Sequence, residues 1–490
     1  MIYSSYIRRN MIAVICIKIE LRKSFEMGIP KDYNVEVVKR EVVIPATVIQ
    51  EHVLPFSNID LTIPPGCFHV FFCYDKPFQT SFASVLSTQK SSLSRAFVSF
   101  PALAGRLVSH GNGDLQMVCN GKGGEFSEAY ADTCIAQVEF YNPIAAIEGK
   151  LVPLLVKDSE GNSSPVFAVQ VTEFSCGGIV VSCIFDHRIA DSFSANLFLT
   201  CWANISRNES IGSITPSFTR SIFIPKDPSN YNSKIKNVYT KVQSFPQPNI
   251  QIPQPAITSR IYYLSAKDIE KLQQNANQNG NKYTKLEAFS AYLWKMLIQG
   301  QDIENTICCN MGITVDGRYR LTKMGMPSNY FGNVISLPFA RARAEDIKKE
   351  PLSWSAKVIH DAIYSAANEE HFQSLVDFVE ISKPSLVLPK ICGFIDEPSI
   401  VVSSGLRFPL YKVDYGWGKP CLASYYLPFV PGYVMPTPSP YGDGSWLIYM
   451  NLLVDQLNAI ESHPDFILHL ISQNIYGGQK SLQFQPFKGF

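Results

Sequence analysis

The stretch Gly178-Ile-Val-Val-Ser-Cys-Ile-Phe-Asp-His-Arg-Ile-Ala-Asp191 sets an apolar run directly before a short polar cluster. The run has the length and β-branched composition of a buried strand, which we expect over residues 179–185. Apolar side chains at helical spacing follow the cluster and predict a helix over residues 192–204. A strand, a polar turn and a helix in this order are typical of α/β proteins, and functional side chains often lie on such turns.

The same alternation recurs along the chain of 490 residues, so the sequence predicts an α/β fold throughout. One hydrophobic core rarely supports a chain of this length, and we therefore expect two domains. Further strands are expected over residues 35–47, 67–74, 167–172, 308–315 and 446–453. Further helices are expected over residues 81–97, 266–278, 285–298 and 457–472.

Residues 214–256 differ in composition from the segments on either side. They hold seven prolines and several serines and asparagines, which is typical of a long crossover between domains. One domain is therefore expected over 31–213 and the other over 257–490. Residues 1–30 are an atypical extension, because the apolar run at 12–17 is too short for a signal peptide. Met27 is a possible alternative start.

The bulk composition narrows the class of partner. Hydrophobic residues make up 46% and charged residues 17%, with a net charge of +1 and no basic run, so nucleic acid is not expected as a partner. No run of roughly 18 apolar residues predicts a membrane span. The twelve cysteines form no Cys-x-x-Cys pair, which argues against a zinc or redox motif and favours free thiols in the cytoplasm. We expect a small-molecule partner and no metal.

His187 is the candidate functional residue, since it begins the turn after the apolar strand. On position alone, a structural histidine with satisfied hydrogen bonds is the commoner explanation. Asp191 suits the cap of the following helix, but a relay of this aspartate, His187 and a serine is also open. The chain has no Gly-x-Ser-x-Gly elbow, which weakens a hydrolase, and it has no phosphate-binding or dinucleotide-binding glycine loop.

A second unusual segment is Val413-Asp-Tyr-Gly-Trp-Gly-Lys-Pro420. Two glycines that flank a tryptophan indicate a special backbone conformation and close packing. A structural loop is the simplest interpretation, and a functional role does not exclude it.

Taken together, the two segments resemble the BAHD family of plant acyl-CoA-dependent acyltransferases, which carries His-x-x-x-Asp near the middle and Asp-Phe-Gly-Trp-Gly near the C-terminus. The resemblance spans roughly residues 34–475 and implies two domains similar to chloramphenicol acetyltransferase, with a central solvent channel between them. Other segments agree with the family pattern, namely Pro101–Leu107, Leu286–Trp294, Val315–Arg320 and Asn329–Asn333.

The resemblance also implies a reaction. His187 would act as general base in the channel and take a proton from an acceptor hydroxyl or amine as that group attacks the thioester of acyl-CoA. Such assistance is worth roughly 10²–10⁴ in rate. Transfer would be direct, which would explain the missing serine elbow. Acyl-CoA would be a co-substrate, with no permanently bound cofactor, and the family is typically monomeric.

Roles of further residues follow from the family pattern. Asp191 would point away from the reaction and pair with Arg318. Thr284 and Lys285 would contact CoA phosphate, with Lys234 and Lys236 as weaker candidates. An architectural loop would be formed by Asp414, Tyr415, Gly416, Trp417 and Gly418.

The chain departs from the family pattern at several positions. Ser192 and Tyr415 replace a usual glycine and a usual phenylalanine. Ser403 and Gly405 stand where related hydroxycinnamoyl transferases often have threonine and tryptophan. We expect Ser403 to orient the acceptor and Gly405 to make room for a bulkier one. A non-transferring relative, either a lyase or a small-molecule binding protein, is the alternative function, and a hydrolase is a third.

Overall fold

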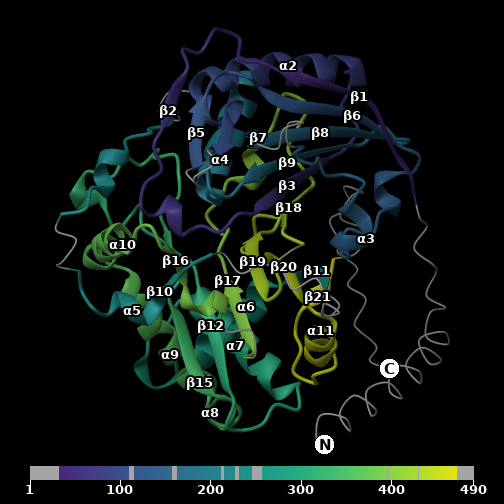
Figure 1. Ribbon diagram of the computed structural model, residues 1–490. Coiled ribbons are helices and arrows are strands. Elements are labelled where there is room, and N and C mark those ends of the chain that lie inside the picture. The colour runs from purple at the N-terminus through teal and green to yellow at the C-terminus, as the bar shows by residue number, and fades with distance from the viewer. Residues whose placement is uncertain are drawn as a thin grey trace, which may run out of the picture.

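Two large β-sheets organise the chain, one above the other in Figure 1. The computed structural model describes residues 33–109, 115–156, 163–210, 215–226, 231–244, 257–393, 397–428 and 430–471. The predicted extension over residues 1–30 lies outside these ranges. The expected α/β character is confirmed, since both sheets are flanked by helices.

The first sheet has six strands in the order β1-β6-β8-β9-β3-β18. All neighbours are antiparallel except β6 and β8, which run parallel. The strand β18 belongs to the C-terminal half of the sequence, so the predicted range 257–490 is not confined to the second sheet. The strands span Val35–Val43 (β1), Cys67–Tyr74 (β3), Gly124–Ala131 (β6), Phe167–Phe174 (β8), Ile179–Asp186 (β9) and Leu422–Tyr426 (β18).

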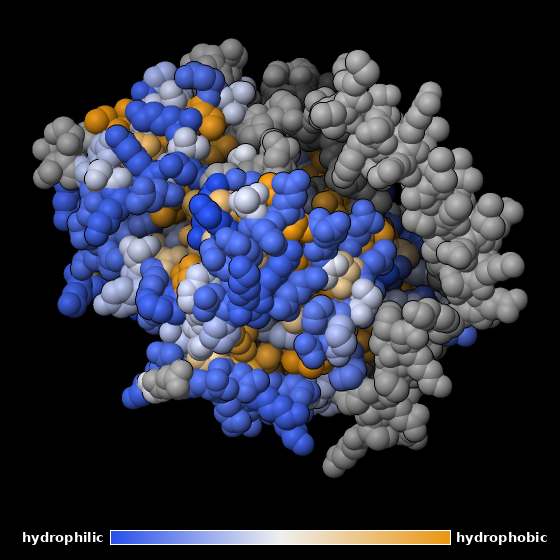
Figure 2. Space-filling view, turned by 90° about the horizontal axis from the view of Figure 1, so that it is seen from below, coloured by the Kyte–Doolittle hydropathy of each residue, from blue (hydrophilic) through white to orange (hydrophobic). Residues whose placement is uncertain are grey.

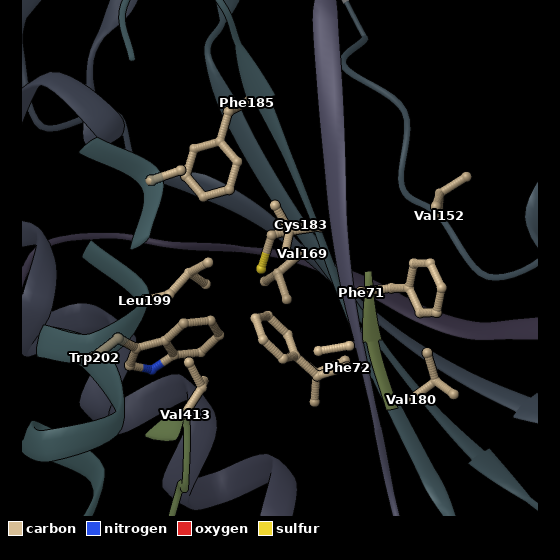
Figure 3. Close-up of a cluster of buried hydrophobic side chains, with 14 of the residues drawn as sticks. Phe71, Phe72, Val152, Val169, Val180, Cys183, Phe185, Leu199, Trp202 and Val413 are labelled. Carbon is tan, nitrogen blue, oxygen red and sulfur yellow. The ribbon is translucent and has the colours of Figure 1, made fainter. Parts of the chain in front are cut away.

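The strand β9 lies inside this sheet, and all eight of its residues are buried. Helices α2 (Phe82–Ser99) and α4 (Ser192–Ser206) pack together above one face of the sheet. Figure 3 shows Trp202 and Leu199 of α4 on the side of Phe72, whereas Phe71 lies on the opposite side of β3. Burial on both faces explains why β9 is mostly apolar, with Ser182 and Asp186 as its polar residues, rather than alternating.

The second sheet has seven strands in the order β15-β12-β17-β19-β20-β11-β21. Its strands span Ile257–Leu264 (β11), Cys308–Ile313 (β12), Phe339–Arg343 (β15), Ser399–Val402 (β17), Tyr433–Pro438 (β19), Trp446–Leu453 (β20) and His469–Leu470 (β21). The helices around it span Ala266–Ala276 (α6), Lys285–Gln299 (α7), Ala344–Lys349 (α8), Leu352–Ala366 (α9) and Val454–Glu461 (α11). Hydrophilic side chains cover most of the described surface on the face seen in Figure 2.

Smaller elements complete the fold. A four-stranded sheet joins His52–Leu54 (β2), Leu115–Cys119 (β5), Arg106–Ser109 (β4) and Ser163–Pro165 (β7). Two-stranded ladders join Val315–Asp316 (β13) to Ile335–Ser336 (β14), and Tyr239–Val242 (β10) to Leu386–Pro389 (β16). Short helices span Pro143–Ile147 (α3) and Ile235–Val238 (α5), and α10 spans Glu369–Ser382.

The predicted crossover is structured in its described part. Phe223, Ile235 and Tyr239 are buried in one cluster with Phe372 and Leu375 of α10. The segment therefore packs on the C-terminal half, which its proline-rich composition alone did not indicate.

The expected helices over 81–97, 192–204, 266–278 and 285–298 are confirmed to within two residues at each end. The helix expected over 457–472 is wrong, because α11 ends at Glu461 and β21 follows. Pro464 explains the early end, since proline breaks the hydrogen-bond pattern of a helix. Residue 472 lies outside the described residues.

Candidate active site

His187 follows the last residue of β9, and both of its backbone groups are hydrogen-bonded. Its N–H donates to the carbonyl of Gly66 at 2.9 Å. Its carbonyl accepts from the side-chain nitrogen of Asn333 at 3.0 Å. The turn that carries the imidazole is therefore fixed from both sides.

The imidazole of His187 is half-buried and lies beside aromatic rings. Its centroid is 5.2 Å from that of Phe68, in an edge-on arrangement. Phe68 in turn contacts Tyr425 of β18, with centroids 6.1 Å apart. The Nδ1 atom of His187 is buried and has no hydrogen-bond partner among the described residues. Nε2 is thus the nitrogen better suited to meet a substrate.

The charged neighbours in the turn are occupied with each other. Asp186 accepts from Arg188 at 2.9 Å and 2.6 Å in a two-point contact. Burial alone would lower the pKa of Arg188, but the hydrogen bond and charge of Asp186 raise it overall. Asp186 is therefore a salt-bridge partner of Arg188 rather than a partner of the imidazole.

Asp191 and Arg318 form the contact that the family resemblance implies. The guanidinium donates to the two carboxylate oxygens at 2.8 Å and 3.0 Å, and both side chains are buried. Asp191 also caps α4 by accepting from the N–H of Ser194 at 2.9 Å. The capping role expected from position and the ion pair expected from the resemblance coexist. Among the described residues, no hydrogen bond or ion pair joins Asp191 to the imidazole, so the relay has no support.

The surroundings of Arg318 neutralise its buried charge. Its guanidinium also donates to the carbonyls of Tyr330 and Gly332 and lies 4.2 Å above the ring of Phe193. Burial alone would lower the pKa of Arg318, but the charge of Asp191 raises it overall. Burial alone would raise the pKa of Asp191, but the charge of Arg318 lowers it overall. Both groups are held in their charged forms.

The loop from Asp414 to Gly418 packs on the first sheet's core. One carboxylate oxygen of Asp414 accepts from the N–H groups of Gly416 at 2.8 Å and Gly418 at 3.0 Å. Both glycines have positive φ, at +111° and +112°. Tyr415 is fully buried, 4.9 Å from Trp202 between ring centroids, and stacks on Trp417 at 5.6 Å. The residues of this loop make no hydrogen bond or ring contact with the His187 imidazole, and their architectural role stays a prediction.

Thr284 and Lys285 lie at the N-terminus of α7. The Thr284 hydroxyl accepts from the N–H of Glu287, and Glu287 accepts from the N–H of Thr284, which makes a capping box. The ammonium of Lys285 is 3.6 Å from Glu270. Local helix capping thus accounts for the Thr284 contacts, and neither Thr284 nor Lys285 contacts His187.

Ser403 and Gly405 follow β17, and Gly405 lies beside Phe408. The backbone N–H of Ser403 donates to Val434, and Phe408 packs on Tyr425 with centroids 6.1 Å apart. A Cβ at Gly405 would come within 2.9 Å of Thr437, 3.1 Å of Met435 and 3.2 Å of Phe408. Neighbouring side chains therefore fill the space beside the Gly405 Cα, and the expectation that Gly405 makes room for a bulkier acceptor stays a prediction.

Several residues at this site were not identified from sequence. Gly66, Phe68 and Asn333 contact His187 directly. Tyr425 packs on Phe68, and Asp60 accepts from Asn333. The Asn329–Asn333 segment was visible as a family-like stretch, but nothing in it signalled a contact with His187.

Within the described ranges, no group of three or more histidine, cysteine or acidic side chains is placed to hold a metal ion. None of the helices described is both long and apolar enough to span a bilayer. A surface cavity of about 430 Å³ lies between the crossover and α9 and α10, where Lys234 and Asp361 are among its lining residues. Lys234, a weaker candidate for contact with CoA phosphate, lines this cavity, whereas His187, Thr284 and Lys285 do not.

Known proteins similar in sequence to this chain are acyltransferases. Residues 33–467 match the sequence profile of the Transferase family. Shikimate O-hydroxycinnamoyltransferase of Nicotiana tabacum is 26% identical over 441 residues, covering 87% of this chain and 98% of the relative. Agmatine hydroxycinnamoyltransferase 1 of Oryza sativa subsp. japonica is 27% identical over 426 residues, covering 84% and 92%.

A solved structure has the same fold. F. graminearum TRI101, complexed with Coenzyme A and deoxynivalenol, matches with a TM-score of 0.70 at 15% identity, covering 85% of this chain and 98% of that chain. The likeness confirms the expected two-domain fold similar to chloramphenicol acetyltransferase.

Proposed function

The chain belongs to the Transferase family, the BAHD acyltransferases, and from this we propose that it moves an acyl group from acyl-CoA to a hydroxyl or amine of a small molecule. The acyl group would be of the hydroxycinnamoyl, benzoyl or acetyl type. The relatives' names include an O-acyl transfer to shikimate and a transfer to agmatine, and both acceptor classes therefore stay within the proposal.

The observation that carries the proposal is the fixed, half-buried His187. Its backbone is hydrogen-bonded on both sides, its ring lies against Phe68, and no carboxylate of the described residues is bonded to the imidazole. A general base needs a defined orientation and an accessible lone pair. With its proton on Nδ1, a neutral imidazole would offer the Nε2 lone pair to the acceptor.

The reaction would proceed in two steps. Nε2 of His187 takes the proton of the acceptor hydroxyl or amine while that atom attacks the thioester carbonyl. The tetrahedral intermediate then collapses and expels the CoA thiolate, which recovers the proton from the imidazolium. General-base assistance of this kind is worth about 10²–10⁴ in rate. No covalent enzyme intermediate is needed.

Donor binding at Thr284 and Lys285 remains part of the proposal. Thr284 uses one lone pair for the helix cap, so its O–H is still able to donate to a phosphate oxygen. The N-terminus of the 15-residue helix α7 and the Lys285 ammonium add positive potential. Ser403 would face the acceptor, as the family resemblance implies; ring contacts run from Phe408, five residues further along, through Tyr425 and Phe68 to His187.

The test is an assay of the purified chain with a matrix of acyl-CoA donors against alcohols and amines, read by product mass and free CoA. We expect His187→Ala to lower kcat by about 10²–10⁴ while the fold is retained. His52→Ala is the control, since His52 is exposed on β2 and bonds only locally. An unchanged rate in His187→Ala would refute the mechanism.

The same assay separates the alternatives. A hydrolase would release free acid without any acceptor, whereas a transferase requires one. A lyase or binding protein that uses the same fold would bind ligand without releasing CoA.

We further propose that the protein is a cytoplasmic monomer. Every cysteine in the described ranges is a free thiol, which suits a reducing compartment. Light scattering during gel filtration tests the monomer, and a fluorescent fusion tests the location.

A further inference from the structure

We propose that Asn333 is a positioning residue for His187, and that Asp60 holds the Asn333 amide in the orientation this role requires. The inference rests on the proposed function, in which His187 is the general base. It concerns a contact between residues that are 146 positions apart in the sequence.

The side-chain nitrogen of Asn333 is surrounded by acceptors. It donates to the carbonyl oxygens of His187 at 3.0 Å and Arg188 at 3.2 Å, and to a carboxylate oxygen of Asp60 at 3.0 Å. Three acceptors around one atom identify it as the amide nitrogen and exclude the flipped orientation. Asn333 is completely buried, so water does not replace these bonds easily.

Asp60 fixes that amide from behind. One of its carboxylate oxygens accepts from both the backbone and the side-chain nitrogen of Asn333, at 2.9 Å and 3.0 Å. The other accepts from the backbone N–H and the hydroxyl of Ser57, at 2.9 Å and 2.8 Å. Arg220 lies 3.5 Å from the same carboxylate. A carboxylate, which accepts at both oxygens, matches this ring of donors.

The segment that carries Asn333 is itself tied to the Asp191–Arg318 pair. The N–H of Val334 donates to Asp191 at 3.2 Å, and Arg318 donates to the carbonyl of Gly332 at 2.7 Å. The buried ion pair therefore acts on His187 through its neighbours in this segment. This gives Asp191 a physical role although its carboxylate does not touch the imidazole.

The consequence for catalysis is geometric. The peptide groups on both sides of the His187 Cα are held, one by Gly66 and the other by Asn333. The direction of the imidazole follows from that backbone, and a displacement of about 1 Å in a reacting group is able to cost on the order of 10²-fold in rate. Loss of the Asn333 amide should therefore lower kcat more than it changes KM.

The experiment compares Asn333→Ala with Asn58→Ala in the full-length protein, with the acyl-CoA and acceptor found active in the matrix. We expect Asn333→Ala to lower kcat by about 10-fold to 10²-fold and to change KM for acyl-CoA by less than about twofold. Asn58 is the matched control, because its buried amide donates to Val376 and Glu380 and not to His187. Its loss should lower stability with kcat unchanged.

A rescue experiment separates positioning from a general structural defect. Free imidazole added to His187→Gly should restore part of the rate, because it does not depend on the His187 backbone. We expect that restored rate to be the same in the double variant with Asn333→Ala. The proposal would be overturned if Asn333→Ala lowered the imidazole-restored rate of His187→Gly by the same factor by which it lowers kcat of the otherwise unchanged protein.

Further variants cover a failure to fold and distinguish failure of the positioning role from failure of the proposed function. If Asn333→Ala does not fold, the variant Asp60→Asn provides the test. It keeps the side-chain volume but places amide hydrogens against the donors of Asn333 or Ser57. An unchanged kcat in Asp60→Asn would overturn the proposal. If His187→Ala is fully active, the proposed function fails first. If His187→Ala is inactive and Asn333→Ala has normal kcat, only the positioning role fails.

Discussion

The turn from Asp186 to Asp191 and the loop from Asp414 to Gly418 are the two family-like segments, and they are stabilised by different physics. In the turn, Asp191 is bonded to Arg318 from the C-terminal half, so a buried ion pair joins distant parts of the chain. In the loop, Tyr415 and Trp417 pack on the core of the first sheet, and the Tyr415 hydroxyl has no partner among the described residues.

The difference shows that a recurring motif does not indicate one kind of role. Removing a partner from a buried ion pair leaves an uncompensated charge, whereas removing an unpaired hydroxyl removes a cost. Variants in the turn should therefore affect stability strongly, and variants in the loop should range from moderately harmful to favourable.

The largest effect should come from Asp191→Ala, which leaves Arg318 charged and buried. We expect a loss of about 3–5 kcal/mol in the free energy of unfolding, measured from urea denaturation. Asp414→Ala is the matched carboxylate in the loop, and it should cost about 1–3 kcal/mol, because only hydrogen bonds to two N–H groups are lost. Equal losses would remove the contrast between the two segments.

A smaller effect should appear in the acid dependence of stability. Burial alone would raise the pKa of Asp191, but Arg318 lowers it below its ordinary value. The stabilisation is thus fully present above the unfolded pKa of about 3.9 and is lost as pH falls through the folded value. Asp191→Asn should be less stable near neutral pH and flatter below about pH 4. Parallel urea midpoints for the two proteins would contradict this.

The backbone of the loop should show an intermediate effect. Gly418 has φ near +112°, and a Cβ there would meet no atom within 4 Å, so Gly418→Ala tests backbone strain without a clash. We expect a loss of about 1–3 kcal/mol by urea denaturation. Gly66→Ala is the control, because its φ lies outside the positive region and its Cβ would also meet nothing. A loss of the same size in both would point away from strain.

The smallest effect should come from Tyr415→Phe, and its sign should be favourable or neutral. Removing the unpaired hydroxyl should raise the free energy of unfolding by up to about 1 kcal/mol with no change in kcat. Tyr74→Phe provides the opposite case, because the Tyr74 hydroxyl donates to the carbonyl of Val413 at 2.8 Å. That variant should lose about 1 kcal/mol by the same measurement. A loss in both would mean that the Tyr415 hydroxyl is bonded.

Local patterns predicted the helices and strands around the site well, because apolar spacing and capping residues are local signals. The strand after residue 178, the cap at Asp191 and the helix α7 all follow from residues a few positions apart. The helix expected over 457–472 was wrong because apolar spacing was given more weight than Pro464.

Contacts between distant residues were not predictable in the same way. The pattern of residues 422–426 is consistent with a strand, but it does not say that this strand lies beside β3 in the first sheet. Gly405 suggested an open wall, yet Thr437, Met435 and Phe408 occupy that space. Both outcomes depend on which surfaces meet in the folded chain.

The sequence by itself determined the α/β class from local apolar spacing, and the family from two distant motifs in their order along the chain. His187 became the candidate base only through that family resemblance, because its position alone favoured a structural histidine. Only the tertiary structure decided how His187 is held. Its carbonyl meets Asn333, and Asn333 meets Asp60 across 273 positions of sequence. Burial makes those hydrogen bonds important for stability, because leaving a buried polar group without a partner costs more free energy than the bond itself contributes.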